Sequence, residues 1–217
     1  VPQTDTNAGA LFILEEMQAT ERLALSLGGR LEHTSVEPDA KGNARFAGAD
    51  KTNDFTAGSL SSGAVYTLTP IWSLAATLGY TERAPTFYEL YANGAHVATG
   101  TYELGDANLK KEKAVSSDLA LRFDNGTHKG SFGVFYSRFS NYIGLLGTGR
   151  TLNDEGEEDA NGIPEYEYSG VRARFAGFEA QDHIKLGEGA YGKFALELSG
   201  DYTRATNLDT GEALPRI

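Results

Sequence analysis

The stretch WSLAATLGY, residues 72–80, places an apolar side chain at every second position and a small or polar one between them. A period of two is the pattern of a β-strand with one apolar face. Trp72 and Tyr80 end the apolar row, and eight residues of extended strand span roughly 26 Å at about 3.3 Å per residue. Strands of membrane β-barrels present an apolar band of roughly 25 Å, flanked by aromatic residues, to lipid. The stretch therefore favours a strand of such a barrel.

The same alternation recurs along the chain and predicts about eight strands. In residues 194–202 the apolar row again runs between two aromatic residues, Phe194 and Tyr202. Most of these strands are near or above ten residues long, whereas strands of globular proteins most often have roughly five or six. The sequence therefore predicts an all-β protein with unusually long strands. The other stretches are residues 21–33, 115–123, 9–16, 60–68, 132–139 and 174–186.

The face opposite each apolar row is rich in ionisable and polar residues. In a soluble core, each such group would cost several kcal/mol unless it were paired. In a wide, water-filled lumen the same groups stay hydrated. We therefore expect an antiparallel transmembrane β-barrel, and eight strands would close only a narrow one, so this chain is expected to be a partial barrel. The residues are Arg30, Glu32, Asp118, Arg122, Glu179, Gln181, His183, Lys185, Glu197 and Asp201.

The predicted connections alternate between short and long. Short turns are expected at residues 18–21, 69–71, 124–129 and 187–189, and long polar loops at 34–55, 83–111, 142–171 and from 205 onward. Structureless loops of this length are uncommon in compact domains. Transmembrane barrels have short turns at the periplasmic end and long loops at the extracellular end.

Composition excludes several classes of function. The chain has 217 residues, no cysteine and a net charge of −11, so thiol chemistry and thiolate metal sites are absent and a nucleic-acid partner is not expected. No apolar run is long enough for a transmembrane helix. Neither a G-x-S-x-G motif nor a Ser, His and Asp spacing typical of a triad occurs, so we predict that the protein is not an enzyme.

Residues 81–106, TERAPTFYELYANGAHVATGTYELGD, resemble a segment of the barrel of TonB-dependent outer-membrane receptors. The matching pattern is R-x-P-x-x-x-E-L-Y, starting at Arg83, followed by a glycine, an E-x-G-D turn, Leu109 and Glu112. Residues 115–123, 132–145, 164–168 and 176–179 are also similar to that family, and the resemblance covers roughly residues 60–202.

The resemblance implies part of a barrel of about 22 strands in the outer membrane of a Gram-negative cell. Such receptors bind a scarce nutrient, a small metal ion or a metal chelate, and import it with energy from TonB. Their expected partners are the outer-membrane lipid, the transported ligand and TonB, which is contacted through an N-terminal region. Residues 1–217 are expected to be one segment of the barrel domain, without the plug domain and the closing C-terminal strands.

Residues 93–96 (NGAH), the acidic run 154–159 and residues 164–168 are similar to the subgroup of these receptors associated with zinc uptake. Imidazole and carboxylate are suitable Zn²⁺ ligands, and acidic loops concentrate divalent cations. Zn²⁺ would be the transported ligand, and no resident cofactor is expected. A siderophore, haem or vitamin B12 receptor would use the same barrel. The candidate ligands are His96, then His33 and Glu103, with Glu155, Glu157, Glu158 and Asp159 as a weak capture cluster.

Two other histidines and one ion pair complete the candidates. His183, on the predicted lumen face, is a wall residue or a translocation contact, and His128 lies in a short turn and receives no role. Pro85 forces Ala84 away from helical angles. We expect Arg83 and Glu89 to pair and hold the loop against the barrel rim.

Two alternatives remain at the level of sequence. One is a small complete outer-membrane barrel of about eight to ten strands, acting as a pore or adhesin. The other is a soluble β-sandwich that binds calcium or a sugar, in which the polar strand faces would be paired between two sheets.

Overall fold

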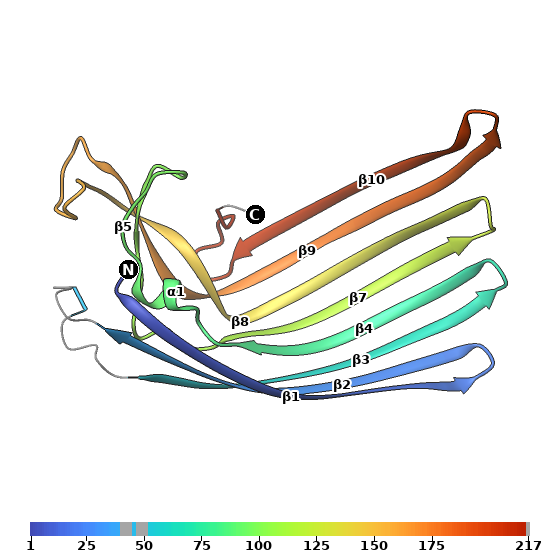
Figure 1. Cartoon of the computed structure of the whole chain (residues 1–217), viewed down its shortest axis with the longest axis horizontal. Coiled ribbons are helices and arrows are strands. Elements are labelled where there is room, and N and C mark those ends of the chain that lie inside the picture. Colours follow the sequence, from blue (N-terminus) through green and yellow to red (C-terminus); the bar gives the residue numbers. More distant parts are fainter. Residues whose placement is uncertain (40–44, 47–51, 216–217) are drawn as a thin grey trace.

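The computed structural model describes residues 1–39, 45–46 and 52–215 as one curved sheet of ten strands with a single short helix in the described part (Figure 1). The predicted all-β class is confirmed. The elements are β1 (Gln3–Thr20), β2 (Leu23–Asp39), β3 (Asn53–Thr69), β4 (Trp72–Arg83), α1 (Phe87–Tyr91), β5 (Asn93–His96), β6 (Thr101–Leu104), β7 (Glu112–Asp124), β8 (His128–Leu152), β9 (Ile163–Gly189) and β10 (Gly192–Asn207).

Apart from the short β5 and β6, the strands are long and pair with their neighbours in chain order. The order β1-β2-β3-β4-β7-β8-β9, with β10 on β9, is an antiparallel meander. β1 and β10 lie at opposite ends of this curved sheet, which is not closed (Figure 1). The prediction of a partial barrel with about eight long strands is confirmed.

No helix in the described residues is long and apolar enough to cross a membrane.

The pairing register confirms the two faces that the alternation predicts. Trp72 lies opposite Phe123, and Tyr80 lies opposite Leu60 and Val115. Because directly opposed residues point to the same side of a sheet, these residues share one face, here called the outer face. Leu60 and Val115 are 66% and 58% exposed, and Trp72 and Tyr80 are 37% and 38% exposed.

The other face, here called the inner face, carries the predicted polar residues. His183 lies opposite Glu197, and Glu179 lies opposite Asp201. His183 Nδ1 and Glu197 Oε1 are 3.2 Å apart, and the Arg30 guanidinium pairs with Glu32 on the same strand. Such groups suit a hydrated lumen wall.

Short turns gather at one end of the sheet and long connections at the other, as predicted (Figure 1). The expected extent of one loop, residues 142–171, is wrong. β8 continues to Leu152 and β9 starts at Ile163, so the two strands form a hairpin that extends past register shifts at Phe139/Tyr142 and Gly147/Thr151. The apolar residues of this hairpin fall in adjacent pairs, such as Tyr142–Ile143 and Leu145–Leu146, so they lack the alternation that reveals a strand in sequence. The predicted bounds of the loop 34–55 are also wrong, because β2 continues to Asp39 and β3 starts at Asn53. Residues 40–44 and 47–51 of that loop lie outside the described residues.

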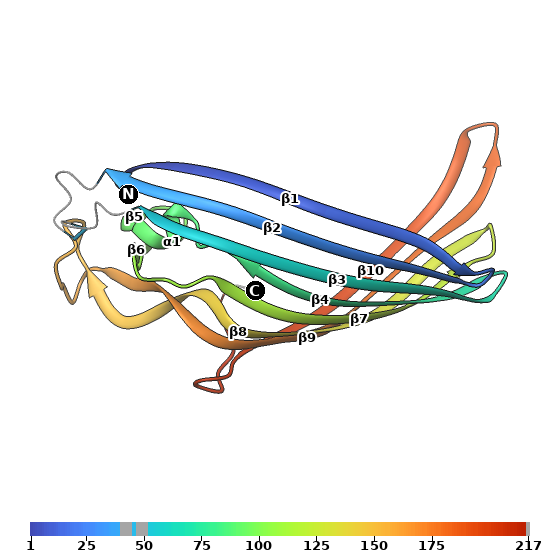
Figure 2. The same cartoon turned by 90° about the horizontal axis from the view of Figure 1, so that it is seen from below.

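The connection between β4 and β7 folds inside the curve of the sheet. Figure 2 shows α1 and β6 between β1–β3 on one side and β8 and β9 on the other. β6 pairs in parallel with β9, with Tyr102 opposite Glu165, although β7 and β8 separate β4 from β9 in the sheet. The main buried apolar cluster lies at this connection: Val36, Phe46, Leu90, Tyr91, Leu109 and Ile143.

Candidate functional site

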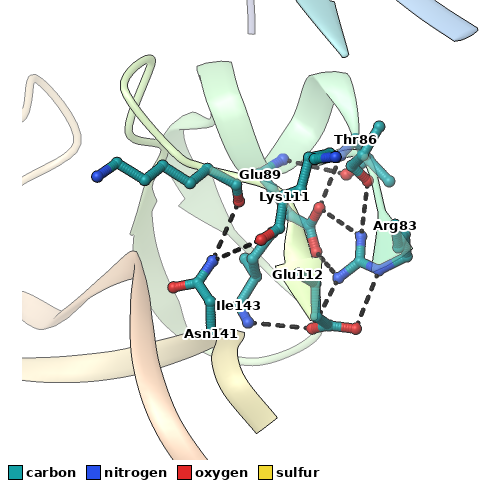
Figure 3. Close-up of polar contacts among 9 residues, drawn as sticks. Arg83, Thr86, Glu89, Lys111, Glu112, Asn141 and Ile143 are labelled. Atoms are coloured by element: carbon teal, nitrogen blue, oxygen red, sulfur yellow. Dashed lines mark hydrogen bonds and ion pairs between the residues drawn. The ribbon is translucent and has the colours of Figure 1, made fainter. Parts of the chain in front are cut away.

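Arg83, the last residue of β4, holds the inward-folded loop by two carboxylates (Figure 3). Its guanidinium donates to Glu89 at 2.8 and 3.0 Å and to Glu112 at 3.3 and 3.2 Å. Glu112 also accepts the backbone N–H of Ile143 at 3.0 Å. The predicted Arg83–Glu89 pair is confirmed. Arg83 therefore joins β4 to α1 and β7, and Glu112 extends the contact to β8.

The start of α1 follows from the local sequence Pro85-Thr86-x-x-Glu89. The Thr86 hydroxyl accepts the Glu89 N–H at 3.3 Å, and the Glu89 carboxylate accepts the Thr86 N–H at 2.7 Å. This reciprocal capping box satisfies two donors that a helix start leaves open. Glu89 therefore serves the helix and the Arg83 clamp at once.

A second polar cluster surrounds Glu103, which is 4% exposed. Its Oε1 accepts from the hydroxyls of Thr99 and Thr101, each at 3.2 Å, and its Oε2 accepts from Tyr88 of α1 at 3.0 Å. Burial, together with the bond to Glu103, raises the pKa of Tyr88 to about 12. The phenol therefore remains a proton donor at neutral pH, and Glu103 ties α1 to β6.

His96 lies beside this cluster at the end of β5. Its Nδ1 is 3.6 Å from Glu103 Oε1 and 2.9 Å from Thr99 Oγ1, and its side chain is 46% exposed. Two of the predicted metal ligands, His96 and Glu103, are thus brought together by the β5–β6 hairpin. Imidazole and carboxylate side by side, with the imidazole open to solvent, can bind a cation.

His33 does not join them, because it lies on the outer face of β2. Its Nδ1 is 3.2 Å from Thr56 Oγ1, and its Nε2 is 3.7 Å from Asp54. His128, at the start of β8 next to a short turn, has its Nδ1 3.8 Å from Asp182 Oδ2.

The four acidic candidates lie in the turn between β8 and β9. The backbone N–H groups of Glu155 and Glu157 donate to the Asn153 side chain, and the Asp159 carboxylate accepts the Asn161 N–H at 2.9 Å. Gly156, at φ 83°, lies so close to the Tyr102 hydroxyl that a Cβ there would be 2.6 Å away, so the turn rests on β6. The backbones of Glu158 and Leu152 form an isolated antiparallel β-bridge. Within the described ranges, no three His, Cys, Asp or Glu side chains form a group suited to a metal.

Sequence reasoning missed the hydroxyl groups around Glu103 and an ion pair with a buried carboxylate and an exposed arginine. Thr99, Thr101 and Glu103 occupy every second position. In an extended segment such residues point to the same side, so this spacing could have predicted their contact. Arg150 donates to Glu165 at 2.6 and 3.0 Å, and Glu165 is only 2% exposed. The pair forms across the β8–β9 hairpin, which the sequence did not reveal.

Gly105 allows the closest backbone approach in the loop. Its N–H donates to Ala92 O at 2.7 Å, and a Cβ at this residue would lie 2.6 Å from backbone atoms of Leu90 and Ala92. We expect Gly105→Ala to push α1 from its seat at a cost of about 1–3 kcal/mol. Limited proteolysis of the folded receptor should then cut the 84–111 loop faster. Gly58→Ala, at a glycine with open space around it, is the control, and equal cleavage of the two variants would contradict the prediction.

Comparison with known proteins gives a consistent result. A family model described as "TonB dependent receptor-like, beta-barrel" matches residues 1–217. The iron-regulated outer membrane virulence protein of Vibrio cholerae serotype O1 is 25% identical over 196 residues, which cover 88% of this chain and 26% of that protein. The chain thus spans about a quarter of the length of this curated relative.

Two solved structures share the fold. The copper transporter OprC superposes with a TM-score of 0.74 at 21% identity, over 98% of this chain and 30% of that one. The ferric citrate transporter FecA in its unliganded form has a TM-score of 0.62 at 20% identity, over 94% of this chain and 27% of that one.

Proposed function

Since the chain belongs to the TonB-dependent receptor-like β-barrel family, we propose that it is part of a receptor that binds a metal ion or metal chelate and imports it with energy supplied by TonB. Its place is the outer membrane of a Gram-negative cell, as the resemblance predicted. The family is one of receptors and transporters. Transport and the contact with TonB are proposed for a complete receptor, in which residues 1–217 supply a stretch of barrel wall and its loops.

The observation that carries this proposal is the inward-folded loop. The loop includes β5 and β6, which carry His96 and Glu103 and lie inside the curve of the sheet, at the end where the long connections gather (Figure 2). A ligand arriving from that end would meet these groups before it reached the lumen wall. The Arg83 clamp holds the loop in that position.

For the transported ligand we propose Zn²⁺, with His96 and Glu103 as direct ligands. Imidazole nitrogen and carboxylate oxygen are both common in zinc coordination. The acidic turn with Glu155, Glu157, Glu158 and Asp159 would attract the cation before binding, because a cluster of negative charges raises the local concentration of cations. His33, on the outer face, takes no part in this proposal. No resident cofactor is required in this proposal.

A ferric chelate is the second candidate, and one observation favours it. Only two of the usual metal-binding side chains converge at His96, and no larger group occurs among the residues described. A chelate brings its own ligands to the metal and needs only a polar and aromatic seat. Tyr88 and Tyr168, whose rings meet edge to face at 6.0 Å, could contribute to one.

Titration of the detergent-purified full-length receptor with Zn²⁺ tests the first candidate. We expect His96→Ala to weaken binding at least about tenfold, which corresponds to about 1.4 kcal/mol, and Glu103→Gln to act in the same direction. His128→Ala, in a short turn at the opposite end, is the matched control. Unchanged affinity in the His96 variant would remove His96 as a ligand, and tight binding of ferric citrate with no response to Zn²⁺ would favour the chelate.

A further inference from the structure

Three arginines form a cluster on the outer face that none of the interactions above explains. Arg138 of β8, Arg174 of β9 and Arg204 of β10 are all exposed. Arg138 lies directly opposite Arg174, and Arg204 lies opposite Ala176, two residues from Arg174 (these three strands lie side by side in Figure 1). We call them the outer arginine cluster.

The cluster is electrostatically unsatisfied within the chain. Side chains directly opposite each other across strands have Cβ atoms about 4.5–5.5 Å apart, and diagonal neighbours lie about 7–8 Å apart, so like charges at these positions repel. Over the described part of the chain, no carboxylate lies within 4 Å of any of the three. Arg172, nearby on β9, has such a partner in Asp209 at 2.6 Å.

Each of these arginines follows directly on an apolar row. Tyr136 and Tyr202 are the outer-face residues next to Arg138 and Arg204 on the same strands, toward the short-turn end. Phe178 of β9 stacks on Tyr202, with ring centroids 5.9 Å apart. These three rings are 41–55% exposed on the outer face. The arginines therefore lie at the edge of the apolar band that faces lipid, on the side of the long loops.

The neighbouring strands continue the pattern. On the outer face, Lys113 of β7 is the next residue after Val115 toward the long-loop end, and Glu82 of β4 is the next after Tyr80. Glu82 is contacted by the ammonium groups of both Lys113 and Lys111. In a chain with a net charge of −11, a cationic belt from β7 to β10 at this height is a local concentration of positive charge.

We propose that the outer arginine cluster binds the phosphate groups of an anionic lipid in the leaflet on the long-loop side, which is the outer leaflet of the outer membrane. Guanidinium groups pair bidentately with phosphate oxygens, and these bonds are stronger than neutral ones. The exposed rings of Tyr136, Phe178 and Tyr202 receive the acyl chains of the same lipid. The combination of unpaired cations and an adjoining apolar wall fits a phosphorylated lipid better than a protein surface.

The test uses the full-length receptor in detergent, with bisphosphorylated lipid A as the probe and the same lipid with its phosphates removed as the comparison. Native mass spectrometry should show that the parent retains bisphosphorylated lipid A at least about tenfold more tightly than the dephosphorylated form. The triple variant R138Q/R174Q/R204Q should lose this preference. The double variant R30Q/R122Q, altered on the inner face, should keep it.

A second measurement needs no variant. Retention of bisphosphorylated lipid A by the parent should fall as salt is raised from about 0.05 to 0.5 M, because exposed charge pairs are screened over about a Debye length. Inorganic phosphate at millimolar concentration should not displace the lipid, since it lacks acyl chains.

Equal retention by the triple variant and the parent would overturn the proposal, as would equal retention of both lipids by the parent. Displacement by inorganic phosphate would assign the site to a free anion instead, and a protein that co-purifies with the parent alone would assign it to a protein partner. The outcome is independent of the proposed metal import, because Zn²⁺ titration of the triple variant is expected to match the parent.

Discussion

Arg83→Met is expected to detach the 84–111 loop from the barrel rim while the strands stay intact. Methionine fills much of the volume but donates no hydrogen bond, so Glu89 and Glu112, whose side chains are 13% and 15% exposed, lose their shared cation. Breaking a fully buried pair costs about 3–5 kcal/mol. The 39% exposure of Arg83 reduces this figure, so we expect about 2–3 kcal/mol for docking of the loop.

Hydrogen exchange in the full-length receptor measures this effect. A loss of about 2–3 kcal/mol corresponds to roughly 30- to 150-fold faster exchange of the amides in α1 and of Ile143. Amides in the middle of β4 should be unchanged. Arg30→Met, which removes an exposed ion pair on β2, is the control. Exchange in α1 that matches the parent would show that the apolar cluster, not the clamp, holds the loop.

Ala76→Arg is expected to impair insertion of the barrel. Ala76 is exposed on the outer face, midway along the apolar row from Trp72 to Tyr80. An arginine on the lipid face near the bilayer midplane costs about 2–4 kcal/mol. The fraction of receptor that folds into lipid vesicles, read from its heat-modifiable gel mobility, should therefore fall at a fixed concentration of urea.

Thr77→Arg is the matched comparison, one residue along on the inner face. Thr77 lies opposite Asp118, so an arginine there meets water and a carboxylate, and we expect folding close to that of the parent. If both variants folded equally well, or if Thr77→Arg were the worse, the assignment of inner and outer faces would be wrong.

Local patterns in the sequence were enough to predict most of the barrel wall. The row from Trp72 to Tyr80 gave strand type, length and the direction of each side chain, because a strand alternates its side chains regardless of its partner. Turn chemistry at residues 124–129 separated β7 from β8. The Arg83–Glu89 pair was also predictable, since the two residues lie six apart in a loop that a proline and a helix cap constrain.

Strands in which apolar residues do not recur at every second position could not be predicted from the sequence. Residues 142–171 were expected to be a loop, because their apolar residues, such as Tyr142–Ile143 and Leu145–Leu146, fall in adjacent pairs rather than at every second position. The register shifts at Phe139/Tyr142 and Gly147/Thr151 break the period further. The parallel pairing of β6 with β9 joins Tyr102 to Glu165 across more than sixty positions of sequence. Such contacts depend on where the loop folds, which no local spacing encodes.

By itself, therefore, the sequence determined the strands, the faces and the end of the molecule at which the long loops lie. It also placed His96 and Glu103 in one predicted loop, residues 83–111, whereas their pairing as the β5–β6 hairpin was seen only in the structure. The tertiary structure alone decided that Tyr88 and two threonine hydroxyls donate to Glu103, that Glu112 shares Arg83, and that Arg138, Arg174 and Arg204 meet on one patch. Each of these depends on the register between strands or the docking of a loop, and a register is set jointly by the patterns of both strands and by the turn that joins them.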